Sequence, residues 1–233
     1  MKILVLGTPR SRSNYLLFAL AQHLRLENLV EPYALNHHDL ARVSDISKTL
    51  SLKDSYICKL QTSDIRPCNH DYHTDNLWYK SFLFHQYDKI ITTSRENMVD
   101  QTASLIVAIE TGNWLGYYSP PAATKIVFQD HHIIMILDII RQKRTLRKIC
   151  DRLQAENLPA EHLYYDTVPN YLRDLGFSGI VEKTLKLSNG SPVSGYDYSK
   201  IIKNYDELRT FVNYVEKNSI INSVLSIDKI KSL

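Results

Sequence analysis

Residues 2–14 read KILVLGTPRSRSN, and this stretch determines the fold class expected for the chain. The run that ends at Leu6 is short and almost wholly apolar, which is typical of a strand buried on both faces of a parallel sheet. A turn follows, and Ser13 can cap a helix with leucines at a spacing of four, at Leu16, Leu20 and Leu24. A strand, a turn and a helix in this order predict the first unit of an α/β fold.

The same alternation continues along the chain. We expect further strands at residues 29–30, 56–60, 89–94 and 162–165. We expect further helices at residues 76–86, 96–110, 130–157, 166–175 and 205–217. The prediction is one α/β domain over residues 1–233, a mostly parallel central sheet flanked by helices, with residues 180–233 as a loop-and-helix extension. Ligands bind beyond the carboxyl ends of such strands, which singles out the turn after Leu6, the turn around Glu31, and Arg95.

Composition excludes several classes of protein. The chain has 233 residues, 44% hydrophobic and 23% charged, so it can bury a core. Its net charge of +3 argues against a nucleic-acid-binding protein. The three cysteines (Cys58, Cys68 and Cys150) are widely spaced, which excludes a disulfide scaffold and a zinc ribbon and favours a reducing compartment. The apolar run before Gly7 is too short for a signal peptide or a bilayer span, so we expect a cytoplasmic protein without membrane insertion.

The turn at residues 7–14 has the chemistry of an anion site. The first amides of a helix lack internal partners and attract anions, and two arginines, two serines and an asparagine surround them here. The turn lacks the second glycine and the lysine of a Walker A motif, which disfavours hydrolysis of a nucleoside triphosphate with magnesium. The alternative is structural: Ser11 and Ser13 only cap the helix, and the arginines are surface charges.

Several motifs resemble those of sulfotransferases that use 3′-phosphoadenosine 5′-phosphosulfate (PAPS). TPRSRSNYL (residues 8–16) resembles the loop that binds the 5′-phosphosulfate, and SRENMVDQTASL (94–105) resembles the segment that binds the 3′-phosphate. QTASL (101–105) with AIETGNW (108–114) is similar to a run in the bacterial trehalose sulfotransferase family. CKL (58–60) and HLYYD (162–166) also match strand ends of that family. The motifs follow the family's order from residue 3 to about residue 175.

The resemblance implies a P-loop-like fold and transfer of a sulfuryl group from PAPS to a hydroxyl of a carbohydrate or another small molecule, with 3′,5′-ADP as product and no metal. It implies that the nucleotide is bound by two groups of residues: Pro9, Arg10, Ser11, Arg12, Ser13, Asn14 and Tyr15 in the loop, and Arg95 and Ser104 at the 3′-phosphate. Within the loop, Arg10 and the amides of residues 11–15 are expected to hold the sulfate. The chain departs from the family where Arg12 replaces a glycine, Asn14 a threonine, and Glu96 a second arginine.

The resemblance implies a glutamate base, because related enzymes place one at the end of the second strand. Glu31 has that position, and burial in a cleft is expected to raise its pKa toward a useful range. His37 and His38 are the alternative bases. Lys59 is a third catalytic candidate, as a cation near the sulfate; its alternative is a surface lysine with a snorkelling side chain.

Three further features of the sequence bear less directly on function. His131 and His132 suggest a metal ligand pair, but adjacent residues point apart and no spacing completes a site, so a helix start is expected. The basic residues at 141–148 are expected to form a solvated face. Variable loops at 33–52, 67–75 and 117–125 are expected to choose the acceptor. A degenerate P-loop kinase and an inactive nucleotide- or glycan-binding relative are the alternative functions. The sequence leaves the oligomeric state open, with a homodimer as one alternative.

Overall fold

The structure is a computed structural model that describes residues 1–32, 40–62, 84–112, 125–177 and 197–218. These divide into two compact units, each treated by itself below. The first unit comprises residues 1–94 and 142–178, and the second comprises residues 95–141 and 179–233. The single domain expected from the sequence stays a prediction.

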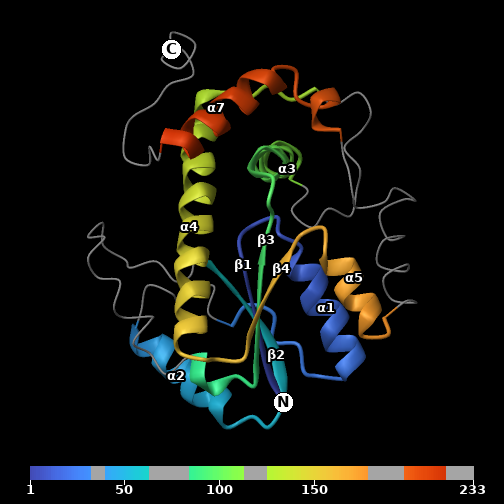
Figure 1. The fold of residues 1–233 in the computed structure, drawn as a ribbon, viewed down its shortest axis with the longest axis vertical. Coiled ribbons are helices and arrows are strands. Elements are labelled where there is room, and N and C mark those ends of the chain that lie inside the picture. The colour runs from blue at the N-terminus through green and yellow to red at the C-terminus, as the bar shows by residue number, and fades with distance from the viewer. Residues whose placement is uncertain (33–39, 63–83, 113–124, 178–196, 219–233) are drawn as a thin grey trace. The chain divides into compact units, whose positions relative to one another are not determined.

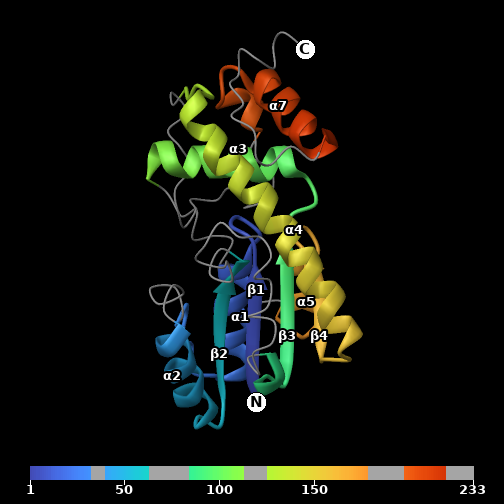
Figure 2. The ribbon, with the colours of Figure 1, turned by 90° about the vertical axis from the view of Figure 1, so that its left-hand side faces the viewer.

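The first unit is built on a four-stranded parallel sheet, which confirms the expected α/β class. Its strands are β1 (Lys2–Gly7), β2 (Tyr56–Gln61), β3 (Lys89–Ser94) and β4 (Ala160–Tyr164). They lie side by side in the order β2-β1-β3-β4 (Figure 2). The chain therefore leaves β1 toward one edge to form β2 and then crosses to the other side of β1 to form β3. This reversal is the point at which α/β sheets bind ligands.

Helices cover both faces of this sheet (Figure 1). One face carries α1 (Ser13–Leu24) and α5 (Val168–Asp174), and α1 contacts β1, β2 and α5. The other carries α2 (Leu40–Ser51) and the second half of α4 (Ile133–Ala155). There, Leu146, Ile149 and Leu153 of α4 pack with side chains of β1 and β2 in one buried cluster. A sheet covered on both faces explains why its inner strands, β1 and β3, are almost continuously buried.

The second unit is helical. It contains α3 (Met98–Thr111), the first half of α4 and α7 (Tyr205–Asn218). Apolar residues of α3, α4 and α7 form one core, including the fully buried Ile136, Leu208 and Val212. Gly112 ends α3 in a left-handed conformation, with φ 67°, as its position after Thr111 predicts.

Most expected elements are found within a few residues of their predicted bounds, with three differences. Residues 40–51, expected as part of a variable loop, form α2. Residues 29–30, expected as a strand, lie beside β2 through a single parallel bridge from Asn28 to Ile57. Of the helix expected at 76–86, only Phe84–Gln86 lies within the described residues, as a 3-10 turn. No α-helix in the described part of the chain is long and apolar enough to cross a bilayer.

Candidate functional site

The first candidate site is the loop between β1 and α1, at the carboxyl end of the strand where the sheet reverses. Gly7 pairs in register with Thr93 of β3, and the amide of Thr8 donates to the carbonyl of Thr93 across 3.4 Å. The loop therefore starts between the ends of β1 and β3. Of the residues predicted to bind the nucleotide, Pro9 to Arg12 form the loop, and Ser13 to Tyr15 begin α1.

Close packing fixes the start of this loop. A Cβ at Gly7 would lie 2.5 Å from Oγ1 of Thr93 and 2.8 Å from Oγ of Ser11. The buried Ser11 hydroxyl donates to the carbonyl of Thr8 (2.7 Å) and lies 2.8 Å from the Thr93 hydroxyl. A hydroxyl has one proton, so Thr93 is then the donor in that second bond. The Ser11 side chain thus holds the loop together. A ligand would therefore be bound by the backbone amide of Ser11 and not by its hydroxyl.

The backbone of the loop is left-handed on both sides of Ser11. Arg10 has φ 62° and Arg12 has φ 65°, a region in which non-glycine residues are uncommon. Arg12, rather than Ser13, is the N-cap of α1, and its side chain makes no capping hydrogen bond. The first turn of α1 also contains no acidic residue. Neither a capping side chain nor an acidic residue of the first turn therefore competes with an anion for its first amides; the anion site itself stays a prediction.

The Arg12 side chain makes its contacts at the end of β4. Its Nη1 donates to the carbonyl of Tyr165 (3.0 Å), and its Cζ lies 3.8 Å from the centre of the Tyr165 ring. The guanidinium is thus engaged by Tyr165. Glycine adopts a left-handed φ such as that of Arg12 without strain, whereas an arginine does not. Arg12 therefore adopts this conformation at a cost in strain.

A buried polar cluster lies beside the first turn of α1. Lys59 of β2 is 3% exposed, and its ammonium contacts Oδ1 of Asn14 and Oε1 of Glu31. The snorkelling surface lysine considered from the sequence is therefore wrong. Gln61 Nε2 donates to the same Glu31 oxygen across 2.8 Å. Glu31, Lys59 and Asn14, three of the predicted site residues, are thereby brought together.

The cluster reverses the expected pKa of Glu31. Burial opposes ionisation of this carboxyl group, but hydrogen bonds from Gln61 and Lys59 and the positive charge of Lys59 outweigh it, so its pKa lies below the usual value. The expectation of a raised pKa is wrong, because it left out the buried cation on the neighbouring strand. In this arrangement Glu31 is an ion-paired carboxylate.

Backbone strain accompanies this cluster. Val30, immediately before Glu31, has φ 53°, which is a genuine outlier for a β-branched residue. The conformation is held from both sides: the Val30 amide donates to Oδ1 of Asn28 (2.9 Å), and its carbonyl accepts from the Lys59 amide (2.6 Å). Strain of this kind persists where surrounding contacts over-determine it, commonly at functional sites.

The second candidate site belongs to the helical unit. Arg95 directly follows β3 and is buried, and its Nη2 lies 3.4 Å from Oδ2 of Asp100 in the first turn of α3. The Tyr205 hydroxyl of α7 donates to the other oxygen of Asp100 (3.3 Å). Ser104 is buried within α3. The sequence indicated Arg95 and Ser104 but missed Asp100, although its spacing of five from Arg95 was visible.

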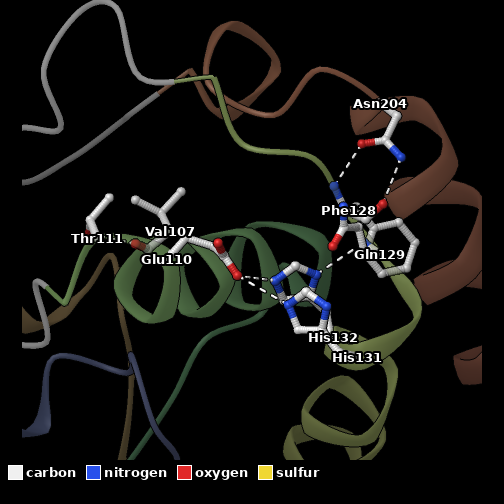
Figure 3. A network of polar contacts seen from close by, with 8 residues as sticks. All are labelled: Val107, Glu110, Thr111, Phe128, Gln129, His131, His132 and Asn204. Atoms are coloured by element: carbon white, nitrogen blue, oxygen red, sulfur yellow. Dashed lines mark hydrogen bonds and ion pairs between the residues drawn. The ribbon is translucent and has the colours of Figure 1, made fainter.

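The helical unit also contains a histidine–carboxylate cluster, shown in Figure 3. Oε1 of Glu110 lies 3.1 Å from Nε2 of His131 and 2.9 Å from Nε2 of His132. The two rings lie 3.9 Å apart. The expectations that the rings point apart and that no carboxylate completes a group were both wrong, because α3 brings Glu110 to them.

Hydrogen bonding nevertheless identifies His132 as a structural residue. Its Nδ1 accepts the amide proton of Gln129 (3.0 Å) at the start of the turn that leads into α4. The ring proton must then be on Nε2, where it is donated to Glu110. A metal at Nε2 would displace this proton while Nδ1 faces a donor, whereas metal-binding histidines donate from their second nitrogen. The helix start expected from the sequence is therefore the better interpretation.

Some predicted residues cannot be placed. His37 and His38, the alternative bases, lie outside the described residues, as does the loop expected at 67–75 and nearly all of the one at 117–125. Among residues that the sequence did not single out, Gln61 and Thr93 contribute to the first site. Their positions at the ends of β2 and β3 were the available signal.

Comparison with known proteins gives one distant likeness to report. No family model matches the chain, and no curated protein matches it. Among solved structures, the YorR protein of Bacillus subtilis, crystallised in complex with phosphorylated GDP, is similar over 79% of this chain and 98% of its own, with a TM-score of 0.48 and 9% identity. A likeness at this level says nothing about which ligand this chain binds.

Proposed function

We propose that this chain is a PAPS-dependent sulfotransferase that acts on a hydroxyl of a carbohydrate or another small molecule. The observation that carries the proposal is the loop at residues 7–14. It starts where the sheet reverses, has two left-handed arginines, and leads into a helix whose first turn has neither a side-chain cap nor an acidic residue. These features support binding of a multiply charged anion, and the ordered sequence motifs favour the phosphosulfate of PAPS.

In the proposed reaction the loop amides and Arg10 hold the sulfate, while Arg95 and Ser104 bind the 3′-phosphate. The acceptor oxygen attacks sulfur as the bond from sulfur to the phosphate oxygen breaks, and the electron pair leaves with 3′,5′-ADP. Glu31 takes the proton of the acceptor hydroxyl. As in phosphoryl transfer, the protein contributes positioning and stabilisation of charge.

The decisive experiment compares 3′,5′-ADP with 5′-AMP by isothermal titration calorimetry, together with transfer of labelled sulfate from PAPS to a panel of sugars. We expect Arg95→Ala to weaken 3′,5′-ADP by about 10- to 100-fold, the loss of charge-assisted hydrogen bonds, and to leave AMP nearly unchanged. Arg209→Ala is the matched control, because Arg209 pairs with Asp206 on the exposed side of α7.

Three outcomes would contradict the proposal. Equal weakening of both nucleotides would reject Arg95 as the ligand of the 3′-phosphate. Tight binding of 3′,5′-ADP without sulfate transfer to any sugar would favour the inactive relative. Magnesium-dependent binding of ATP in preference to PAPS would favour the degenerate kinase.

A further inference from the structure

The inference starts from Lys59, a charged side chain that is buried in β2. Lys59 follows Cys58 and precedes Leu60, both in the apolar cluster on the α2 and α4 face of the sheet. Because side chains alternate along a strand, Lys59 projects to the opposite face, toward α1. Burying an ammonium group costs free energy unless partners compensate. Here its partners are Glu31 and Asn14, the latter in the first turn of α1.

The loop itself lacks the lysine that a Walker A motif would supply. One loop arginine, Arg12, directs its guanidinium to Tyr165 at the end of β4. The Lys59 ammonium, by contrast, touches the second residue of α1, beside the amides that face the loop. It is therefore a cation from another strand at the place where a loop lysine would act.

We propose that Lys59 is a second cation of this anion site, in addition to Arg10, and that a bound anion draws it away from Glu31, so that Glu31 controls the availability of Lys59. The inference rests on the anion-binding part of the proposed function and not on sulfate transfer. An ammonium has three protons to donate. Glu31 and Asn14 take two, and an anion at the first turn of α1 would compete with Glu31 for the charge of Lys59.

The exchange would also prepare Glu31 for its proposed role as base. In the free protein, Lys59 and Gln61 hold the pKa of Glu31 below its usual value against the effect of burial. When Lys59 turns to the anion, burial acts on Glu31 with less opposition, and its pKa rises. A carboxylate with a higher pKa is a stronger base, so the donor's sulfate would activate the group that accepts the proton.

The test is a double-mutant cycle on the full chain, with inorganic pyrophosphate as the probe and its affinity measured by calorimetry. Glu31→Gln frees Lys59 and should tighten binding by about 3- to 10-fold. Lys59→Met removes the cation and exposes the ligand to Glu31, and should weaken binding by about 10- to 100-fold. The double variant should bind more tightly than Lys59→Met and more weakly than wild type.

The double variant distinguishes direct contact from simple neutralisation. If Lys59 only cancels the charge of Glu31, the double variant will bind like Glu31→Gln itself, and the inference is wrong. Equal or weaker binding by Glu31→Gln, or no binding of pyrophosphate by the wild type, would also overturn it. If Lys59→Met fails to fold, Lys59→Gln takes its place in the cycle, with the same expected order of affinities.

The chain offers a matched control pair. Lys53 and Glu27 form an ion pair of 2.8 Å in the same unit, with side chains 35% and 52% exposed. Lys53→Met and Glu27→Gln should each change pyrophosphate affinity by less than about 2-fold. Changes as large as those at Lys59 and Glu31 would mean that any charge change in this unit alters the affinity, and they would overturn the inference. Titration with 3′,5′-ADP separates the two proposals. If the variants bind pyrophosphate in the expected order of affinities but the protein does not prefer 3′,5′-ADP over AMP, only the sulfotransferase proposal is wrong. If the protein prefers 3′,5′-ADP but the variants do not follow that order, only the proposed movement of Lys59 from Glu31 to the anion is wrong.

Discussion

The two candidate anion sites each pair a buried cation with a partly exposed carboxylate, but they are assembled in different ways. At the first site, the Lys59 and Glu31 side chains are 3% and 25% exposed, and the partners come from segments 28 positions apart. At the second site, the Arg95 and Asp100 side chains are 8% and 33% exposed, and only five positions separate them. The second pair is local and could form wherever α3 forms; the first depends on the whole sheet.

The comparison teaches that the first site is the more sensitive to packing. Its loop, its carboxylate and its cation meet only if β1, β2 and β3 keep their register. Any change that disturbs the carboxyl end of β1 at Gly7 should therefore remove several interactions at once. The second site should tolerate comparable changes nearby.

The largest expected effect comes from Gly7→Ala, compared with Gly112→Ala at the end of α3. A Cβ at Gly7 would lie 2.5 Å from Oγ1 of Thr93, whereas no atom of the described residues lies within 4 Å of one at Gly112. We expect Gly7→Ala to lower the free energy of unfolding by about 2–4 kcal/mol, through overpacking and the lost bonds of Ser11. Gly112→Ala puts an alanine into a left-handed conformation, which should cost about 1–2 kcal/mol.

Urea denaturation measures both costs, and calorimetry with pyrophosphate measures the site. Gly7→Ala should also lose most of its affinity for pyrophosphate, and Gly112→Ala should keep it. Equal costs in stability, or undiminished affinity in Gly7→Ala, would contradict the view that the first loop is fixed by close packing.

The same contrast explains what the sequence could and could not predict. The strands ending at Gly7, Gln61 and Ser94 were predictable because each is a short run rich in apolar or β-branched residues and is bounded by turn residues. The reversal of strand order puts the loop where such sheets bind ligands. This order depends on which strands pair, and the sequence of a single strand does not determine it. The α2 helix was missed although Ile46 and Leu50 have helical spacing, because residues 33–52 were assigned to a variable loop that chooses the acceptor.

The chemistry of the first site shows the same limit. The candidates Glu31 and Lys59 were both identified, each from its place at a strand end. Their pairing was not, since side chains alternate across a strand and neither position alone says which face is covered. The wrong pKa direction for Glu31 followed directly from the missing partner. Predicting residue types at strand ends was possible; predicting their electrostatics required the register.

An intermediate effect is expected from the pH dependence of stability, with Glu31→Gln as the probe. The pKa of Glu31 is lowered in the folded protein from the usual 4.5. Its interactions therefore stabilise the fold above that value, and the stabilisation is lost as the pH falls through the folded pKa. At neutral pH we expect Glu31→Gln to be less stable than wild type by about 1 kcal/mol, as for a hydrogen-bonded charged group that is partly exposed.

The measurement is urea unfolding of both proteins from neutral pH to about pH 3. The difference in free energy of unfolding should shrink as the pH falls, and it should vanish at the acid end. A difference that grows toward acid would mean that the folded protein raises the pKa of Glu31, as first expected from burial alone.

The smallest effect is expected from Arg12→Gly. Arg12 in the loop lies near a tyrosine ring, as Arg95 does at the second site. Its Cζ lies 3.8 Å from the Tyr165 ring, whereas Arg95 lies 6.0 Å from the Tyr198 ring. Arg12→Gly loses the contacts with Tyr165, worth about 1 kcal/mol, but relieves a left-handed conformation of similar cost. The net change in stability should stay within about 0.5 kcal/mol, while Arg12→Ala, which keeps the strain and loses the contacts, should cost about 1 kcal/mol.

Ligand binding then decides what the Arg12 guanidinium does. Because it is held at the end of β4, Arg12→Gly should change pyrophosphate affinity by less than about 3-fold, far less than the loss expected for Lys59→Met. A loss of 10-fold or more would mean that the guanidinium leaves Tyr165 for the anion. In that case Arg12 would join Arg10 as a cation supplied by the loop, and the first site would resemble the second, where Arg95 next to the strand end is the proposed ligand of the phosphate.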